Sequence, residues 1–137
     1  MKIDTAQLRD FGKRYTAAWC SQDAERVAAF FSTHGSLSIN GGAPALGRGA
    51  IREVVQEFMT AFPDLVLTMD DVRVEGDRVV YQWTFAGTST GTGGTGRRVL
   101  FSGFEEWEMG ADGLIAGSLG HFDEADYQHQ LEHGAGF

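Results

Sequence analysis

The first half of the chain shows the three-to-four-residue spacing of apolar side chains that is typical of amphipathic helices. A helix is expected from a cap at Asp4 to Trp19, and a second, short helix is expected to reach Phe31. Residues 51–62 fit the helical template most completely, and the proline that follows ends this third helix. Residues 36–40 alternate between apolar and polar side chains, which predicts a short strand before it.

From Leu65 onward the apolar period changes to two, which indicates strands. Four strands are expected, over residues 65–70, 79–88, 97–109 and 114–122. The tail from Glu124 is expected to form a short helix. Helices followed by consecutive antiparallel strands predict an α+β fold in one domain, residues 1–137, in which a curved sheet and the helices enclose a pocket.

Composition and charge restrict the function classes. The formal net charge is -8, which repels phosphate backbones and argues against nucleic-acid binding. No apolar run reaches the length of a membrane span, and the N-terminus lacks the apolar segment of a signal peptide. Cys20 is the only cysteine, so no internal disulfide is expected. A cytoplasmic protein is therefore expected, and the aromatic share of 12% predicts a cavity or interface lined by rings.

Two sequence features match ligand-binding motifs only superficially. Residues 91–96 match the dinucleotide pattern Gly-x-Gly-x-x-Gly, but an expected strand follows where that motif needs a helix. We therefore interpret the segment as a hairpin loop. His121, Asp123 and His129 could share an ion, but their spacing matches no familiar metal motif. The sequence thus predicts neither a metal site nor an organic cofactor.

The richest acid–base segment is Gly117–Asp123, at the end of the last expected strand. Asp123 could act as a general base if aromatic walls raise its pKa, or it could cap the helix that follows. His121 could donate a proton to a developing oxyanion, or it could be a partly exposed histidine at a strand edge. Strand alternation puts both side chains on one face. Whether that face lines the pocket decides between the catalytic and the structural interpretations.

Several short motifs resemble known domains, and together they cover nearly the whole chain. Similarity to the start of nuclear-transport-factor-2-like (NTF2-like) domains lies in Arg14–Trp19, Asp23, Val27–Phe31 and Gly49–Arg52. Resemblance to the SnoaL-like polyketide cyclase branch lies in Thr95–Val99, Gly113–Ile115, Phe122-Asp123 and Gln130-Leu131. The resemblance implies an NTF2-like cone, in which a curved antiparallel sheet surrounds a pocket and helices close one side, usually in a homodimer.

The same resemblance implies candidate roles for individual residues. In the cyclase branch, a carboxylate near the end of the last strand is the acid and base of an aldol ring closure that needs no metal or organic cofactor, and Asp123 matches it. Ketosteroid isomerases give a second comparison, in which Tyr15 matches the oxyanion-hole tyrosine and Glu105 or Glu106 falls near the acid. Asn40 stands near their proton-shuttling aspartate and takes no proton, which argues against steroid isomerase chemistry.

Strand periodicity leaves open whether Glu105 or Glu106 faces the pocket, because each face of their strand carries at least one acid and one ring. An inward Glu105 would be favoured in its neutral form as a donor, whereas an outward one would be solvated. Tyr15 could reach the pocket or pack in the core, and Asn40 could orient a ligand or belong to a turn. The predicted substrate-binding residues are Tyr15, Trp19, Asn40, Trp83, Phe101, Glu105, Trp107 and Phe122.

The sequence therefore predicts a SnoaL-like protein that transfers protons on a hydrophobic, polyketide-like carbonyl compound, as an aldol cyclase or isomerase. Asp123 and His121 are its predicted catalytic residues, and a homodimer is expected. The alternative is a non-catalytic dimer module that binds a small molecule in the same pocket. An inward Asp123 and His121 would favour the enzyme, whereas an Asp123 that caps the tail helix and faces solvent would favour the binding protein.

Overall fold

The computed structural model describes residues 4–91 and 93–135, which form four helices and one six-stranded sheet. The helices are α1 (Thr5–Cys20), α2 (Ala24–Ala28), α3 (Gly47–Ala61) and α4 (Glu124–His133). The strands are β1 (Phe31–Ile39), β2 (Ala45–Leu46), β3 (Val66–Glu75), β4 (Arg78–Thr88), β5 (Arg98–Met109) and β6 (Ile115–Phe122). The predicted α+β class is confirmed.

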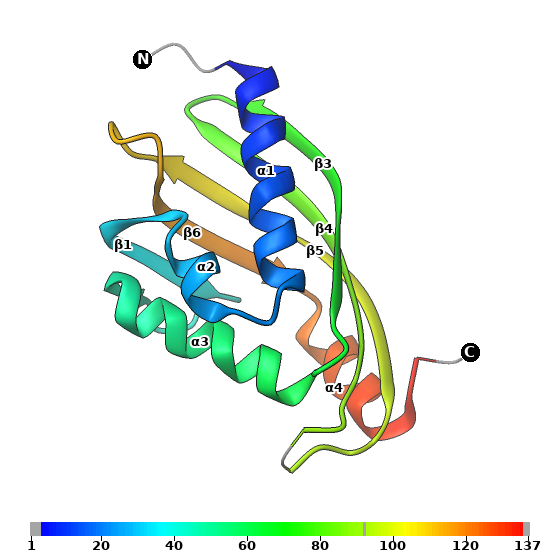
Figure 1. Ribbon diagram of the computed structural model, residues 1–137. Helices are drawn as coiled ribbons and strands as arrows, with labels where there is room; N and C mark the ends of the chain where they lie inside the picture. Colours follow the sequence, from blue (N-terminus) through cyan, green and yellow to red (C-terminus); the bar gives the residue numbers. More distant parts are fainter. Residues whose placement is uncertain (1–3, 92, 136–137) are drawn as a thin grey trace.

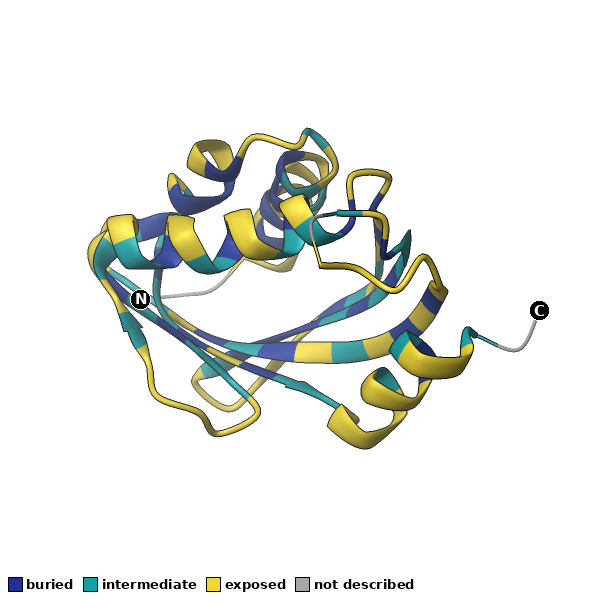
Figure 2. Cartoon of the chain, turned by 90° about the horizontal axis from the view of Figure 1, so that it is seen from below, coloured by how far each residue is buried: buried dark blue, intermediate teal, exposed yellow. Residues whose placement is uncertain are grey.

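The sheet is curved and does not close on itself (Figure 1). Its strand order is β2-β1-β6-β5-β4-β3, and β1 and β6 form its one parallel pair among the described residues. Helices α1, α2 and α3 lie along one face of the sheet, whereas α4 lies apart from them beyond the end of β6 (Figures 1 and 2). The apolar sides of α1–α3 and the facing side of the sheet therefore form one buried layer between them.

Helix α1 carries Tyr15 to the centre of this layer. The helix begins where the Asp4 carboxylate accepts hydrogen bonds from the backbone N–H groups of Ala6 and Gln7, at 2.9 and 3.4 Å. Its buried stripe recurs at helical spacing and comprises Leu8, Phe11, Gly12, Tyr15 and Ala18. The Tyr15 ring meets the rings of Phe30, Tyr81 and Trp107 edge-on, with centroids 5.2–5.7 Å apart.

The segment between the first two helices and the third differs from the sequence-based expectation. Helix α2 ends at Ala28, and Phe31 begins β1 instead of completing the helix. Phe31 is fully buried and pairs with Ile115 of the distant strand β6, so tertiary packing decides its conformation. Strand β1 is consequently longer than residues 36–40, and β2, which the sequence did not predict, pairs with it.

The inner face of the sheet is fixed by the register of β4, β5 and β6. Trp83 lies opposite Gly103, and Gly103 lies opposite Phe122. A Cβ atom at Gly103 would collide with the His121 carbonyl oxygen and would come within 2.6 Å of the Trp83 ring. Glycine is therefore required at this position, because it lets the indole of Trp83 lie against the backbone of β5.

A side-chain amide of helix α4 binds the backbone of β5. Gln130 Oε1 accepts a hydrogen bond from the Leu100 N–H at 2.6 Å, and its Nε2 donates to the Leu100 carbonyl at 2.9 Å. The Tyr127 ring adds contacts with Phe101 and Phe122, with centroids 5.0 and 5.5 Å apart. The helix that was expected after Glu124 is thus confirmed and held beside β5.

Two further expectations concern connections and membrane spans. Residues 91–96 lie in the connection between β4 and β5, as the hairpin interpretation predicts, although position 92 lies outside the described residues. Within the described part of the chain, no helix is both long and apolar enough to cross a membrane.

Candidate functional site

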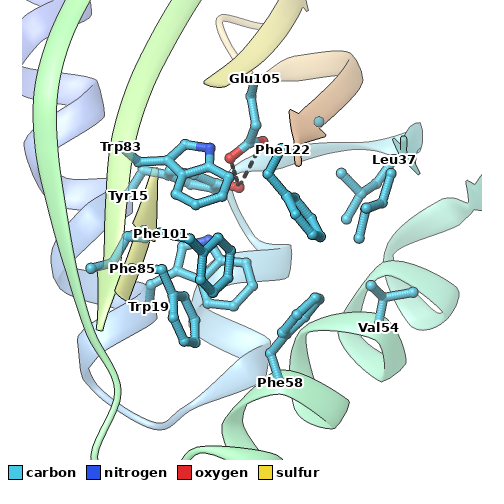
Figure 3. A pocket seen from close by; sticks show the side chains of 13 residues that line it. Tyr15, Trp19, Leu37, Val54, Phe58, Trp83, Phe85, Phe101, Glu105 and Phe122 are labelled. Atoms are coloured by element: carbon cyan, nitrogen blue, oxygen red, sulfur yellow. Dashed lines mark hydrogen bonds between the residues drawn. The ribbon is translucent and has the colours of Figure 1, made fainter. Parts of the chain in front are cut away.

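A cavity of about 70 Å³ lies between the inner face of the sheet and helices α1 and α3 (Figure 3). Its walls are almost entirely aromatic and aliphatic side chains. The lining residues are Tyr15, Trp19, Leu37, Ile39, Val54, Phe58, Leu67, Trp83, Phe85, Phe101, Glu105, Gly120 and Phe122. Glu105 and Tyr15 are the titratable members of this set, so any acid–base chemistry inside the cavity passes through them.

Glu105 is buried and accepts hydrogen bonds from three side chains. The Ser118 hydroxyl donates at 2.7 Å and the Trp107 indole N–H at 3.1 Å, both to Oε1. The Tyr15 hydroxyl lies 3.1 and 3.2 Å from the two carboxyl oxygens (Figure 3). None of the ion pairs between described residues involves Glu105. The site is therefore a buried carboxyl group with polar donors and no positive partner.

Burial and hydrogen bonding act on the Glu105 carboxyl in opposite directions. Removal from water raises its pKa, and the donors Ser118, Trp107 and Tyr15 oppose that rise without cancelling it. Burial also raises the pKa of Tyr15 well above its usual value, with a further contribution from the nearby carboxyl group. Tyr15 therefore stays neutral and Glu105 is the group that changes charge.

The donors around Glu105 accommodate both of its charge states. An indole N–H can only donate, whereas a hydroxyl can donate or accept. When Glu105 is ionised, Trp107, Tyr15 and Ser118 can all donate to it. When it is protonated, its O–H can donate to either hydroxyl. The carboxyl group thus has hydrogen-bond partners in both of its charge states.

Replacing Tyr15 with phenylalanine is expected to cost about 1 kcal/mol more stability at neutral pH than in acid, because the ionised carboxylate loses a donor. In the wild type the pKa of Glu105 is raised in the folded state, so folding favours the protonated carboxyl group. The contribution of Glu105 to the free energy of unfolding is therefore complete below the pKa that Glu105 has in the unfolded chain. It is lost as pH rises through the pKa that Glu105 has in the folded protein. The variant raises that pKa further. Urea denaturation at both pH values measures the difference, and an equal cost at both would contradict it.

The structure places Asp123 and His121 outside the cavity. Asp123 is exposed and is the N-cap of α4, where its Oδ1 accepts a hydrogen bond from the Asp126 N–H at 3.0 Å. His121 lies on the outer face of β6, with Nε2 2.8 Å from a carboxyl oxygen of Glu106 and its ring stacked on Phe104. Strand alternation explains both positions, because Phe122 between them points inward.

The role of Asp123 as a cap predicts different outcomes for two substitutions. Asp123→Ala is expected to destabilise the fold by about 1 kcal/mol, because the first turn of α4 loses its acceptor. Asp123→Asn is expected to be nearly neutral, because an amide oxygen caps almost as well. Urea denaturation of the two variants tests this difference. A loss of proton-transfer activity in a stable Asp123→Asn variant would contradict the capping role and would support the hypothesis that Asp123 is the catalytic base.

Two other predicted ligand contacts lie away from the cavity. Asn40 is exposed at the turn after β1 and has a positive φ of 51°. Its amide accepts from the Phe122 N–H at 2.9 Å and donates to Glu124 at 3.2 Å, so it joins the end of β1 to the start of α4. Trp107 is fully buried behind Glu105 and does not line the cavity. It supports the carboxyl group through its indole N–H.

The remaining predicted ligand contacts do line the cavity, namely Tyr15, Trp19, Trp83, Phe101, Glu105 and Phe122. Sequence reasoning missed Ser118, the nearest donor to Glu105. The signal was present, because Ser118, Gly120 and Phe122 share one face of β6 by alternation. It also missed Phe58 and Phe85, which complete the aromatic wall.

Within the described residues, no group of three or more His, Cys, Asp or Glu side chains is arranged to hold a metal ion.

Comparison with known proteins identifies the family of this chain. The family model for SnoaL-like domains matches residues 13–118. The chain belongs to the SnoaL-like domain family. A search of curated proteins gives no significant match. The predicted resemblance to the SnoaL-like branch, and with it the NTF2-like fold, is confirmed by the family match and by solved structures.

Solved structures share the fold of this SnoaL-like protein at low sequence identity. TsrD from Streptomyces laurentii is 24% identical over 95% of this chain and 98% of its own, with a TM-score of 0.79. A protein with a ketosteroid isomerase-like fold from Catenulispora acidiphila, solved in complex with trimethylamine, is 15% identical over 89% of this chain and 92% of its own, with a TM-score of 0.78. SalBIII, described as an epoxide hydrolase/cyclase-like enzyme in pyran ring formation in the polyether salinomycin, is 16% identical over 90% and 95%, with a TM-score of 0.77. These similarities establish the fold alone.

Proposed function

We propose that this SnoaL-like protein is a cofactor-independent proton-transfer enzyme for a hydrophobic carbonyl compound, with Glu105 as its acid–base group. The observation that carries the proposal is a buried carboxyl group, with a raised pKa and reversible hydrogen-bond partners, at the wall of an apolar cavity. A general acid–base group is most effective when its pKa approaches the working pH, and burial moves a glutamate in that direction.

The proposed step begins with ionised Glu105. Its carboxylate removes a proton from the carbon beside the substrate carbonyl, the C–H electron pair forms the new C=C bond, and the carbonyl oxygen becomes an enolate oxygen. Glu105 now holds the proton, and Tyr15 and Ser118 can turn to accept its O–H. Return of the proton to another carbon gives an isomerase. Attack of the enolate carbon on a second carbonyl, with the proton passed to the new alkoxide, gives an aldol cyclase.

Trp83 is the proposed partner of the enolate oxygen. Its indole Nε1 is buried and, among the described residues, has no hydrogen-bond acceptor, although the side chain lines the cavity. Leaving such a donor unpaired is costly, and a ligand oxygen would remove that cost. Trp19 Nε1 is also without an acceptor of good geometry, but it lies close enough to the Tyr15 hydroxyl to lower the pKa of Tyr15. Trp83 is therefore the better candidate.

A second candidate function is ligand binding without turnover in the same cavity. It is favoured by the position of Asp123, which caps α4 and faces solvent instead of entering the cavity. The two functions share the apolar walls and differ only in whether Glu105 exchanges a proton with the ligand.

Deuterium exchange from heavy water into a panel of aromatic and polycyclic ketones, followed by NMR, tests the proposal. Exchange by the enzyme is expected to fall with decreasing pH, with an inflection above the ordinary glutamate pKa, because only ionised Glu105 accepts a proton. Ligand line broadening without any exchange above buffer would favour the binding function and overturn the catalytic one.

A further inference from the structure

We infer that the cavity binds a compact alkylammonium group, which lies against the aromatic walls with ionised Glu105 as its counterion. The inference goes beyond the proposed function, because it concerns the charge of the bound molecule and needs no turnover. It rests on two features of the described residues: the ring arrangement around the cavity and the absence of a positive partner for Glu105.

Six aromatic side chains surround the cavity as one connected set of rings. Trp19 and Phe58 lie 6.2 Å apart by centroid, Phe58 and Phe85 are also 6.2 Å apart, and Phe85 and Phe101 are 5.1 Å apart. Phe101 lies 5.2 Å from Phe122, which in turn lies 6.1 Å from Trp83. A cation within about 6 Å of several ring centroids gains attraction from each ring, as in the aromatic cages that bind quaternary ammonium groups.

The charge of the cavity is the second feature. Glu105 is the single carboxyl group among the lining residues, and the ion pairs of the described chain leave it out. A buried charge without a partner is strongly unfavourable, and the three hydrogen bonds to Glu105 reduce that cost without neutralising the charge. An ammonium group in the cavity would supply the missing charge.

A neutral apolar ligand would have the opposite effect on Glu105. It would remove remaining water from the carboxyl group and favour the protonated form, whereas an ammonium ligand favours the ionised form. The titratable groups that face Glu105 are Tyr15 from α1 and Tyr81 from β4, and both keep their protons because burial raises their pKa values. Trp107 from β5 and Ser118 from β6 do not titrate in this range. Cation binding therefore strengthens as pH rises through the pKa of Glu105.

The test compares choline with 3,3-dimethylbutan-1-ol, which has the same shape with carbon in place of the charged nitrogen. Titration calorimetry on the wild-type protein is expected to give at least about tenfold tighter binding of choline above the pKa of Glu105, a preference that shrinks toward acid pH. Glu105→Gln is expected to remove the preference, whereas Glu106→Gln, the same change on the outer face of β5, is expected to keep it.

Equal or tighter binding of the neutral alcohol by the wild type would overturn the inference, as would failure of choline to bind at millimolar concentration. A choline preference that survives in a folded Glu105→Gln protein would also overturn it, because the rings alone would then be responsible. The wild-type comparison stands even where a variant fails to fold. Because no reaction is measured, the outcome is independent of the deuterium-exchange test of the proposed function.

Discussion

Replacing Glu105 with glutamine is expected to slow deuterium exchange into a ketone substrate by at least about 100-fold, the usual contribution of a positioned general base. Glutamine has nearly the shape of glutamate and can keep hydrogen bonds to Tyr15 and Ser118, but its amide does not accept a proton at neutral pH. The cavity and its ring walls should therefore persist while the chemistry is lost. Exchange rates and urea denaturation of the same samples separate loss of activity from loss of fold.

Glu106→Gln is the matched control for this experiment. Glu106 is the next residue on β5 and points to the opposite face, where it contacts His121 instead of the cavity. The control removes the same charge from the same strand and is expected to leave the exchange rate within about twofold of wild type. The Glu106 side chain is partly exposed on the opposite face of β5, where solvent and salt screen its charge. Equal losses in both variants would show that Glu105 is not the base.

Replacing Trp107 with alanine is expected to have the largest effect on stability, a loss of about 3–5 kcal/mol in the free energy of unfolding. Trp107 is fully buried, stacks on Tyr81 with centroids 4.8 Å apart, and contacts the rings of Phe11 and Tyr15 edge-on. The variant leaves a cavity beneath the sheet and also removes a donor from Glu105. Chemical denaturation measures the loss.

Trp19→Ala is the comparison for this prediction. Trp19 is only partly buried and already borders the cavity, so its removal enlarges an existing space and is expected to cost clearly less. A Trp107→Ala protein that is no less stable than the Trp19→Ala protein would contradict the packing argument. The Trp107 variant should also raise the pKa of Glu105, because the ionised carboxylate loses a hydrogen bond.

The spacing of apolar residues along the chain predicts much of this fold. The helical stripe of residues 51–62 and the alternation in β4 and β5 each bury one face, so their patterns predict their structures directly. The sequence predicts a helix at Phe31, because its neighbours Val27 and Phe30 have helical spacing. Its place in β1 depends on Ile115, a partner that lies more than 80 positions away and that no local pattern identifies.

The candidate site was harder to predict, because alternation along a strand does not say which of its two faces lines the cavity. Glu105 and Glu106 are equally plausible inward residues by sequence, and only the pairing of Gly103 with Phe122 and of Trp107 with Ser118 fixes which one enters the cavity. The same ambiguity leaves open, from sequence, whether Asp123 and His121 face the cavity. Asp123 lies one residue beyond β6, where capping the next helix is the stronger local demand.

The bond between Gln130 and Leu100 has a consequence for how copies of this chain behave in solution. Beyond the end of β6, the N–H and carbonyl of Leu100 would otherwise face outward as the open edge of a β-strand, which is a template for pairing with another chain. The amide of Gln130 occupies both groups as a backbone partner would. Helix α4 thus protects a sheet edge against intermolecular β-pairing, and its detachment would expose an aggregation-prone strand.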